Sequence, residues 1–470
     1  MVSRRDWEIS SPTYRAREME ILAGWIRAGE SGSVIGLAGA GKSNLLGFLC
    51  HQPHVMADQY LHGRFGLVLV LVDLNNLPDN DPSTFYRVIL RSLYEARGQL
   101  TAIKESLPDT VQDLYHKIEE KTDPFVSQSA LREVLFSFVE GGARLVLVMD
   151  PFDRFCRVAT TQILDNLRGL RDSFKATLSY IVGLRCELTY IRDPIEMGEL
   201  YDILDTHVCW LGPMQSEDAR SVINQMEERI AQSLDDRQVK WLIDVTGGYP
   251  ALLRAASLWL AQAPPRSDVL TWEKQLLAEP SIQNRLNDVW QGLTGEEQAV
   301  LSVLHTPLSI APERDQTENV RQVEERHRHV LNRLKAKHLC TQAGTGWEMF
   351  SPLFARFVAS VKGIAAGRIE YDPQTDRFFR GERELADLSG QDRRLLRHFL
   401  DRPMVAHSID DLADAAWAEY DSSGVTDETV QQAIRHLRKR LELNPAQPRY
   451  VITQRGVGYR FVPEGVPQAQ

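Results

Sequence analysis

The stretch that decides the fold is Gly36-Leu37-Ala38-Gly39-Ala40-Gly41-Lys42-Ser43. Residues 33–35 before it are predicted to end a strand, and residues 44–49 after it are predicted to open a helix. A glycine-rich loop between a strand and a helix, closed by Lys-Ser, is the Walker A pattern. Glycines let the backbone curl so that successive N–H groups point inward, and the helix N-terminus adds partial positive charge. The sequence therefore predicts a phosphate-binding loop.

Individual loop residues have predicted tasks. Lys42 is expected to reach the β- and γ-phosphates of a nucleotide, and the Ser43 hydroxyl to bind Mg²⁺. Arg15, next to Tyr14 before the first helix, either closes over an adenine base or belongs to an ordinary helix start. Pro250, in the element 247–250 (Gly-Gly-Tyr-Pro), either forms a hinge or packs against the base. The predicted nucleotide-binding set is Arg15, Gly36, Gly39, Ala40, Gly41, Lys42, Ser43, Asn44 and Pro250.

A second signature follows further along the chain, where the apolar stretch Arg144–Asp150 is predicted to be a strand that ends in a carboxylate. In P-loop proteins this aspartate holds Mg²⁺, so Asp150 and Ser43 are the predicted metal ligands. Pro151 occupies the position at which many such ATPases carry an acidic residue that orients water. Asp153 either replaces it or caps a helix, and hydrolysis is expected to be slow. Arg185, after another strand, either senses the γ-phosphate or forms a surface ion pair. Asp150, Asp153 and Arg185 are the candidate catalytic residues.

The order of the predicted elements gives the architecture. Strands at 33–35, 66–73, 144–150, 178–185 and 206–213 predict a five-stranded parallel sheet with helices on both faces, an α/β P-loop fold. From residue 216 the chain is predicted to be helical. The expected domains are a nucleotide-binding domain at 1–214, a helical lid at 215–290, a winged helix at 291–362, and a winged helix-turn-helix at 365–465.

Bulk composition limits the classes of protein. A chain of 470 residues has room for about three domains. Its net charge of −10 argues against a wholly basic nucleic-acid coat, and its five scattered cysteines argue against a metal or disulfide framework. The N-terminus has no apolar segment typical of a signal peptide, and the apolar runs are too short to span a bilayer. We expect a soluble cytoplasmic protein without membrane contact.

The Walker A loop, the Asp150 strand, the Arg185 strand and the 247–250 element, in this order, resemble the STAND class of signal-transducing ATPases. They are also similar to the origin-recognition branch of AAA+ proteins. The resemblance covers residues 10–362 and implies a nucleotide-binding domain, a lid and a winged helix that together clamp ADP in the resting state. Many relatives carry Met-His-Asp where this chain has Met349-Phe350-Ser351, and Phe350 cannot make the β-phosphate contact of that histidine.

The C-terminal hundred residues contain a helix, 426–441, with two faces. An apolar stripe, which includes Val430, Ile434 and Leu437, is expected to be core. Between residues 431 and 460 seven basic residues stand against Glu442 alone, so either nucleic-acid binding or a solvated charged face is indicated. The candidate DNA-binding residues are Thr429, Gln431, Gln432, Arg435, His436, Arg438, Lys439 and Arg455.

This segment, with its basic helix and the stretch 455–461 (Arg-Gly-Val-Gly-Tyr-Arg-Phe), resembles the winged helix-turn-helix of OmpR/PhoB response regulators. The resemblance implies a recognition helix in the major groove and a wing arginine, Arg455, in the minor groove. Gln and Arg are side chains that make bidentate contacts to adenine and guanine. Glu428 at the start of the helix would repel phosphate.

Taken together, the sequence predicts a nucleotide switch that carries its own DNA-binding module. ATP, ADP and Mg²⁺ are the expected cofactors. Double-stranded DNA and further copies of this chain in the ATP state are the expected partners, together with RNA polymerase or a signal partner, and transcription regulation is the expected output. Two alternatives stay open: an ATPase that loads onto or remodels DNA, and a signalling ATPase whose C-terminal module binds protein.

Overall fold

The computed structural model describes residues 11–63, 66–230, 233–262, 269–304, 324–343, 346–361, 367–381, 383–417 and 425–468. The chain forms two compact units. The first comprises Met1–Ile243 and Gly248–Ala261, and the second comprises Asp244–Gly247 and Gln262–Gln470. The domain boundary expected at residues 362–365 lies outside the described residues, so it stays a prediction.

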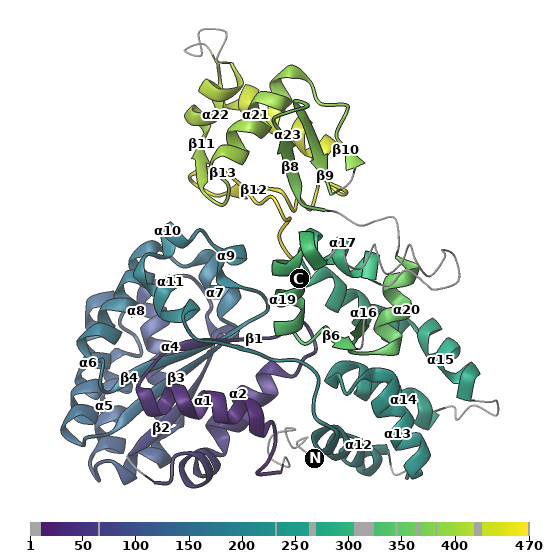
Figure 1. Cartoon of the computed structure of the whole chain (residues 1–470). Helices are drawn as coiled ribbons and strands as arrows, with labels where there is room; N and C mark the ends of the chain where they lie inside the picture. Colours follow the sequence, from purple (N-terminus) through teal and green to yellow (C-terminus); the bar gives the residue numbers. More distant parts are fainter. Residues whose placement is uncertain are drawn as a thin grey trace. The chain divides into compact units, whose positions relative to one another are not determined.

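A five-stranded parallel sheet forms the centre of the first unit (Figure 1). Its strands are β1 (Gly32–Ile35), β2 (Leu67–Asp73), β3 (Arg144–Asp150), β4 (Leu178–Leu184) and β5 (Val208–Trp210), in the order β2-β3-β4-β1-β5. Every residue of β1 and β4 is buried, and since successive side chains alternate between faces, helices must cover both sides of the sheet. The predicted sheet is confirmed.

The register of the sheet brings the ends of four strands to one edge. Asp73 at the end of β2 pairs with Asp150 at the end of β3, and Ile35 at the end of β1 pairs with Leu184 at the end of β4. Because β4 lies between β1 and β3, the loop that follows β1 and the carboxylate that ends β3 share this edge with Arg185. The strand order therefore assembles the candidate site from segments far apart in the sequence.

Helices surround the sheet of the first unit. Helix α2 (Lys42–His51) begins directly at the glycine loop and packs against β2, β3 and β4. Several helices begin with proline after an aspartate whose side chain accepts an N–H of the first turn, as at Asp81 before α4. The remaining helices before the lid are α1 (Ala16–Ala28), α3 (Pro53–Val55), α4 (Pro82–Glu95), α5 (Leu107–Ile118), α6 (Pro124–Glu140), α7 (Phe152–Val158), α8 (Thr161–Ser173), α9 (Leu188–Ile191), α10 (Pro194–Met197) and α11 (Glu199–Asp205).

Three helices follow the sheet: α12 (Ser216–Ile230), α13 (Asp236–Thr246) and α14 (Pro250–Gln262). They lie within the predicted lid, whose bounds stay a prediction. Gly247 and Gly248 between α13 and α14 have φ of 61° and 72°, in the left-handed region that favours glycine. A Cβ on Gly248 would lie 2.7 Å from the carbonyl oxygen of Met214. The glycine pair is therefore required both by its conformation and by close packing.

The described part of the second unit continues with helices and a hairpin. The helices are α15 (Val269–Ala278), α16 (Pro280–Gln291), α17 (Gly295–Leu304), α19 (Arg328–Ala336) and α20 (Pro352–Ser360), and the hairpin is β6 (Cys340–Ala343) paired with β7 (Gly346–Met349). The helix α15 and nearly all of α16 fall in the predicted lid, 215–290, and the elements from α17 to α20 fall in the predicted winged helix, 291–362; both domains stay predictions. Ser351, whose side chain is fully buried, caps α20 and donates a hydrogen bond of 2.9 Å to the carbonyl of Val245. Phe350 thus stands where the resemblance predicts histidine, and it stacks on Phe354.

The C-terminal module has three helices flanked by small sheets. The strands β8 (Ile369–Asp372), β9 (Arg377–Arg380) and β10 (Arg383–Glu384) form one sheet, and β11 (Ala406–Ser408), β12 (Val451–Gln454) and β13 (Gly458–Phe461) form the other. The helices are α21 (Gly390–Asp401), α22 (Ile409–Ala416) and α23 (Asp427–Leu441). The apolar stripe of α23 lies in the core of this module with Leu395, Phe399 and Phe461, which confirms the predicted winged helix-turn-helix.

None of the helices in the described part of the chain is long and apolar enough to cross a membrane.

Candidate nucleotide site and nucleic-acid interface

Neighbouring segments form hydrogen bonds to the backbone carbonyls of the glycine loop. Three consecutive loop carbonyls each accept one hydrogen bond: Ala38 from the Tyr249 hydroxyl at 2.8 Å, Gly39 from the Ala251 N–H at 3.1 Å, and Ala40 from Arg15 Nη2 at 2.9 Å. The N–H and C=O of a planar peptide point in opposite directions, so fixing these carbonyls also fixes the N–H groups of the following residues. The loop is therefore held in a defined curl before any ligand enters.

The glycines of the loop are required by its conformation. Gly39 and Gly41 have φ of 81° and 90°. A Cβ on Gly39 would lie only 2.4 Å from Cβ of Ala251, so the loop and the start of α14 approach as closely as their backbones allow. The ring of Pro250 lies 3.4 Å from the position that a Cβ on Gly41 would take. Pro250 thus packs on the loop, and its contact with a base stays a prediction.

Arg15 lies next to the loop, and its two terminal guanidinium nitrogens are hydrogen-bonded to the protein, whereas its buried Nε has no hydrogen-bond partner among the described residues. The side chain is 1% exposed, and besides Ala40 it donates to the carbonyls of Gly212 and Pro213 at 2.9 and 3.2 Å. Its own N–H donates to Asp218 on α12, and burial raises the pKa of that carboxyl. Arg15 therefore ties the loop to the segment that leads into the lid. An adenine contact of Arg15 stays a prediction.

The predicted metal ligands lie together at the edge of the sheet. Ser43 Oγ donates to Asp150 Oδ2 at 2.6 Å, and Lys42 Nζ lies 3.6 Å from Asp150 Oδ1. Asp150 Oδ1 is buried and has no hydrogen-bond partner among the described residues. A hydroxyl oxygen beside a carboxylate oxygen with a free lone pair fits the oxygen ligands that Mg²⁺ prefers. The residues present therefore fit the expected metal, which would be held by Ser43 and Asp150.

The other two catalytic candidates form an ion pair near this carboxylate. Arg185 Nε lies 3.9 Å from Asp153 Oδ2, and Asp153 is 4% exposed. Asp153 lies in the first turn of α7, whose N-cap is Pro151 with no side-chain cap bond, so Asp153 does not cap the helix. Its Oδ1 is buried without a hydrogen-bond partner in the described part of the chain. The roles of Asp153 in hydrolysis and of Arg185 in phosphate sensing stay predictions.

Most of the predicted DNA-binding side chains lie on the solvent face of α23. None of the residues that the structure describes forms an ion pair with Arg435, Lys439 or Arg455. Arg455 lies in the tight turn between β12 and β13, next to Gly456 with φ 78°. The exposed candidates are Thr429, Gln432, Arg435, His436, Lys439 and Arg455, and Gln431 is half-buried.

Two of the candidates are engaged within the module. The guanidinium of Arg438 donates to the Val451 carbonyl and to the Thr453 hydroxyl, and burial lowers its pKa. His436 Nδ1 lies 3.1 Å from the Asp392 carboxylate, which also belongs to the capping box of α21. Arg438 thus connects the helix to the wing, and His436 connects it to α21. DNA contacts of either side chain stay predictions.

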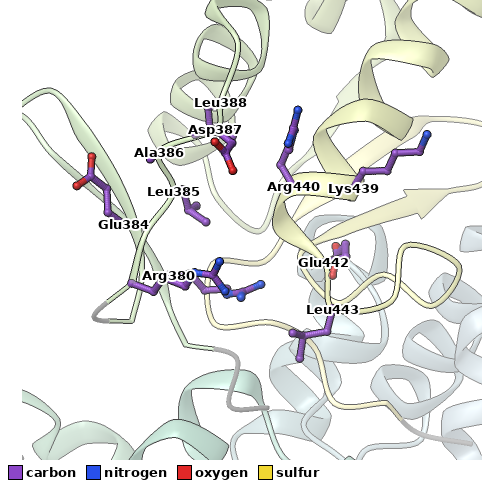
Figure 2. A pocket seen from close by; sticks show the side chains of 11 residues that line it. Arg380, Glu384, Leu385, Ala386, Asp387, Leu388, Lys439, Arg440, Glu442 and Leu443 are labelled. Carbon is purple, nitrogen blue, oxygen red and sulfur yellow. The ribbon is translucent and has the colours of Figure 1, made fainter. Parts of the chain in front are cut away.

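Further cations gather at the C-terminal end of α23. A pocket of about 320 Å³ lies at this end of the helix. Figure 2 shows Lys439 and Arg440 of α23 and Arg380 of β9 among the residues that line it. Arg380 donates to the Leu441 carbonyl at 2.9 Å, which fixes β9 to the end of the helix. The sequence gives no signal for Arg380, because its neighbourhood arises from the packing of a distant hairpin. The same holds for Tyr249, whose hydroxyl reaches the loop.

Sequence comparisons concern the C-terminal module. Residues 382–461 match the family model described as "Transcriptional regulatory protein, C terminal". The transcriptional regulatory protein YvrH of Bacillus subtilis is 38% identical over 93 residues, which are 20% of this chain and 38% of that protein. The alkaline phosphatase synthesis transcriptional regulatory protein SphR of Synechococcus elongatus is 39% identical over 89 residues, 19% of this chain and 34% of that one. The chain thus spans about a third of the length of these curated relatives, and its C-terminal module is similar to the C-terminal domain of transcriptional regulatory proteins.

Solved structures resemble the P-loop part of the chain. The Walker-type ATPase PABY2304 of Pyrococcus abyssi is 13% identical with a TM-score of 0.42, over 73% of this chain and 95% of that one. The ORC2 protein of Aeropyrum pernix, solved as ADPNP–ADP complexes, is 12% identical with a TM-score of 0.38, over 74% and 93%. With identities this low and TM-scores below 0.5, these similarities carry nothing about activity. The P-loop ATPase fold rests on the strand order and the loop geometry described above.

Proposed function

We propose that this protein is a DNA-binding regulator of the STAND type, switched by ATP and ADP. The observation that carries the proposal is that one chain joins a phosphate loop with a paired Ser43 and Asp150 to a winged helix-turn-helix with an open basic face. The nucleotide state would control assembly of the chain into oligomers and thereby its binding to DNA. Transcription regulation in the cytoplasm is the proposed output, with RNA polymerase or a signal protein as a further partner.

At the nucleotide site, the chain's own residues would distinguish ATP from ADP. The curled loop presents N–H groups to the phosphates, and Lys42 now paired with Asp150 would turn to the β- and γ-phosphates. Mg²⁺ supplies positive charge against the phosphate oxygens. Arg185 would exchange its contact with Asp153 for the γ-phosphate. A ligand shifts an equilibrium only by its differential affinity for the two states, and the γ-phosphate is the difference available here.

At the DNA interface, the exposed side of α23 would enter the major groove. Gln432 and Arg435 have the side chains that read adenine and guanine through two hydrogen bonds, and Arg455 on the wing would reach the minor groove. Lys439 would contact phosphate. Because the rest of the chain is acidic, we expect modest affinity of one copy and strong dependence on salt. Assembly of several copies would raise the affinity through effective concentration.

The proposal is tested by sizing the full chain with ADP and with a non-hydrolysable ATP analogue, each with and without a DNA duplex. We expect larger assemblies and tighter DNA binding with the analogue, and slow ATP turnover. Lys42→Ala should lose ATP binding and every nucleotide effect, and unchanged ATP affinity in this variant would refute the site. Equal size and equal DNA affinity of the wild-type protein in both nucleotides would refute the switch.

A second candidate function is an ATPase that performs work on DNA. The buried, unpartnered Oδ1 of Asp153 favours it, since this oxygen could orient an attacking water in place of the residue that Pro151 replaces. Steady ATP turnover that duplex DNA stimulates would support this function, together with loss of turnover in Asp153→Asn. Slow turnover that DNA leaves unchanged would support the switch. A C-terminal module that ignores duplex DNA at low salt would favour a protein partner.

A further inference from the structure

The winged helix and the DNA-binding module of the second unit share an interface that the recognition face does not use. The N–H groups in the first turn of a helix lack partners within the helix, so they need acceptors from elsewhere. At α17 the C-terminal segment of the DNA-binding module supplies two acceptors: Gly465 O accepts from Gly295 N–H at 3.3 Å, and Glu464 O accepts from Glu296 N–H at 3.1 Å. The same segment donates a third backbone hydrogen bond, from Gln468 N–H to the carbonyl of Gln291 at the end of α16, at 2.8 Å.

Arg449, just before β12, is the centre of this interface. It is 5% exposed, and its guanidinium donates to Gln298 Oε1 at 2.7 Å and to the Leu293 carbonyl at 2.6 Å, both in the winged helix. A third donor, Nε, bonds to the Val466 carbonyl within its own module at 3.0 Å. A buried guanidinium whose donors are shared in this way fixes the two modules to each other in a single geometry.

From Arg449 the contacts continue directly to the recognition helix. Glu442 is the C-cap residue of α23 and is buried, and its carboxylate accepts the backbone N–H of Arg449 at 2.7 Å. The same carboxylate accepts the N–H groups of Tyr450 and Val451 at 2.9 and 3.0 Å. The segment that carries Arg449 is therefore bonded to the C-cap residue of α23.

In the other direction the contacts lead to the last turn of α13. The Gln298 side chain donates to the Trp290 carbonyl at 2.7 Å, and the Trp290 ring lies 6.4 Å from the ring of Phe357 on α20. Helix α20 is capped by Ser351, which donates to the Val245 carbonyl. A continuous series of packed and hydrogen-bonded groups thus runs from the lid segment to the recognition helix within the second unit.

We propose that this interface, with Arg449 as its positioning residue, makes the winged helix and the DNA-binding module one rigid body, so that movement of the winged helix aims the recognition helix. The interface leaves Arg435 and Lys439 exposed, so it controls orientation and does not cover the DNA-binding face. The inference that the nucleotide state controls the orientation of the recognition helix rests on the proposed function. The inference that the two modules form one rigid body does not rest on it.

The rigidity is tested in the full chain by distance distributions between spin labels at Arg328→Cys on α19 and Asp401→Cys at the end of α21. Both positions are exposed, and the five native cysteines are buried. We expect a narrow distribution in the parent protein. Gln298→Leu, which removes the acceptor of Arg449 without touching the DNA-binding module, should broaden it, and Arg449→Gln should do the same from the other side.

Two controls separate this effect from loss of folding. Gln298→Glu keeps an acceptor for Arg449 but loses the hydrogen bond to the Trp290 carbonyl, so it should give a distribution narrower than that of Gln298→Leu. Arg285→Gln, an exposed neighbour on α16, should leave the distribution unchanged. DNA affinity without nucleotide should stay within about twofold of the parent in Gln298→Leu, since the recognition face is intact. A parent distribution as broad as that of Gln298→Leu, or a Gln298→Leu distribution as narrow as the parent's, would overturn the proposal.

The nucleotide readout distinguishes this proposal from the proposed function. Allosteric coupling commonly changes an affinity 5- to 150-fold, so we compare the ratio of the DNA affinities in the ATP and ADP states. This ratio should fall toward one in Gln298→Leu and recover in Gln298→Glu. A parent protein without any such ratio would refute the nucleotide switch, and the label distances would still decide the rigid body. A ratio that Gln298→Leu leaves intact would refute the role of the interface in control.

Discussion

Gly183 on β4 offers a sharp test of the metal site, because it lies against the carboxylate of Asp150. A Cβ at Gly183 would lie 2.2 Å from Asp150 Oδ1, whereas carbon and oxygen need more than 3 Å, so Gly183→Ala must displace that oxygen by about 1 Å. A misplacement of about 1 Å at a reacting or ligating group costs roughly a hundredfold. We therefore expect affinity for ATP with Mg²⁺ to fall ten- to a hundredfold, about 1.4–2.7 kcal/mol, because Asp150 and Ser43 no longer meet.

The assay is titration calorimetry with ATP, in Mg²⁺ and in excess chelator. The substitution leaves the glycine loop in place but displaces the oxygen that Lys42 Nζ approaches, so affinity in chelator measures any effect through Lys42. The further loss that appears only with Mg²⁺ measures the effect on the metal site. Gly169→Ala on α8 is the matched control, since a Cβ there meets nothing within 4 Å. If Gly183→Ala bound ATP with Mg²⁺ as tightly as the wild-type protein, Asp150 would not be a metal ligand.

Three further predictions follow from other contacts. Tyr249→Phe removes one hydrogen bond to the loop, so it should lower the free energy of unfolding by about 1 kcal/mol and weaken ATP binding. Thermal unfolding and calorimetry measure the two effects. Unchanged values would show that the hydroxyl does not shape the loop. Arg435→Ala should cost about 1–3 kcal/mol on a target duplex and relax specificity at one base pair, and a uniform loss on all sequences would assign Arg435 to phosphate. Burial, with His407 and Arg402 nearby, lowers the pKa of His398, so the folded state favours the neutral imidazole. The contribution of His398 to the free energy of unfolding is therefore complete above a pH of about 6.5 and is lost as the pH falls below that value. The thermal unfolding midpoint should be lower at pH 5.5 than at pH 7.5, and His398→Gln should reduce this difference.

Much of the architecture follows from local sequence patterns. Strands such as Arg144–Asp150 are continuous apolar runs, and the helix 426–441 has a clear apolar stripe, so periodicity alone identifies them. The winged helix-turn-helix could be predicted because its core residues and its wing occur within one short segment. Strand order is different, because no local pattern states that β4 lies between β1 and β3.

The positions of candidate site residues could be predicted where the residues belong to a recognisable motif. They could not be predicted where a residue's contacts depend on segments far away in the sequence. Lys42, Ser43 and Asp150 lie together as the motifs indicate. For Arg15 the sequence shows an arginine before a helix, but only packing brings its guanidinium to three carbonyls in two other segments. From the sequence, Arg438 likewise looks like an exposed cation of the helix, yet its guanidinium is hydrogen-bonded to the Val451 carbonyl of the wing.

The dependence of the phosphate loop on remote donors has a consequence for biosynthesis. The tyrosine that holds the Ala38 carbonyl lies 211 residues further along the chain, and the N–H that holds Gly39 follows it closely. A nascent chain that has released only its parallel sheet from the ribosome has the motif but lacks two of the three bonds that shape it. The loop geometry on which the proposed triphosphate binding depends therefore forms late, when the start of α14 has left the ribosome and packed against the loop.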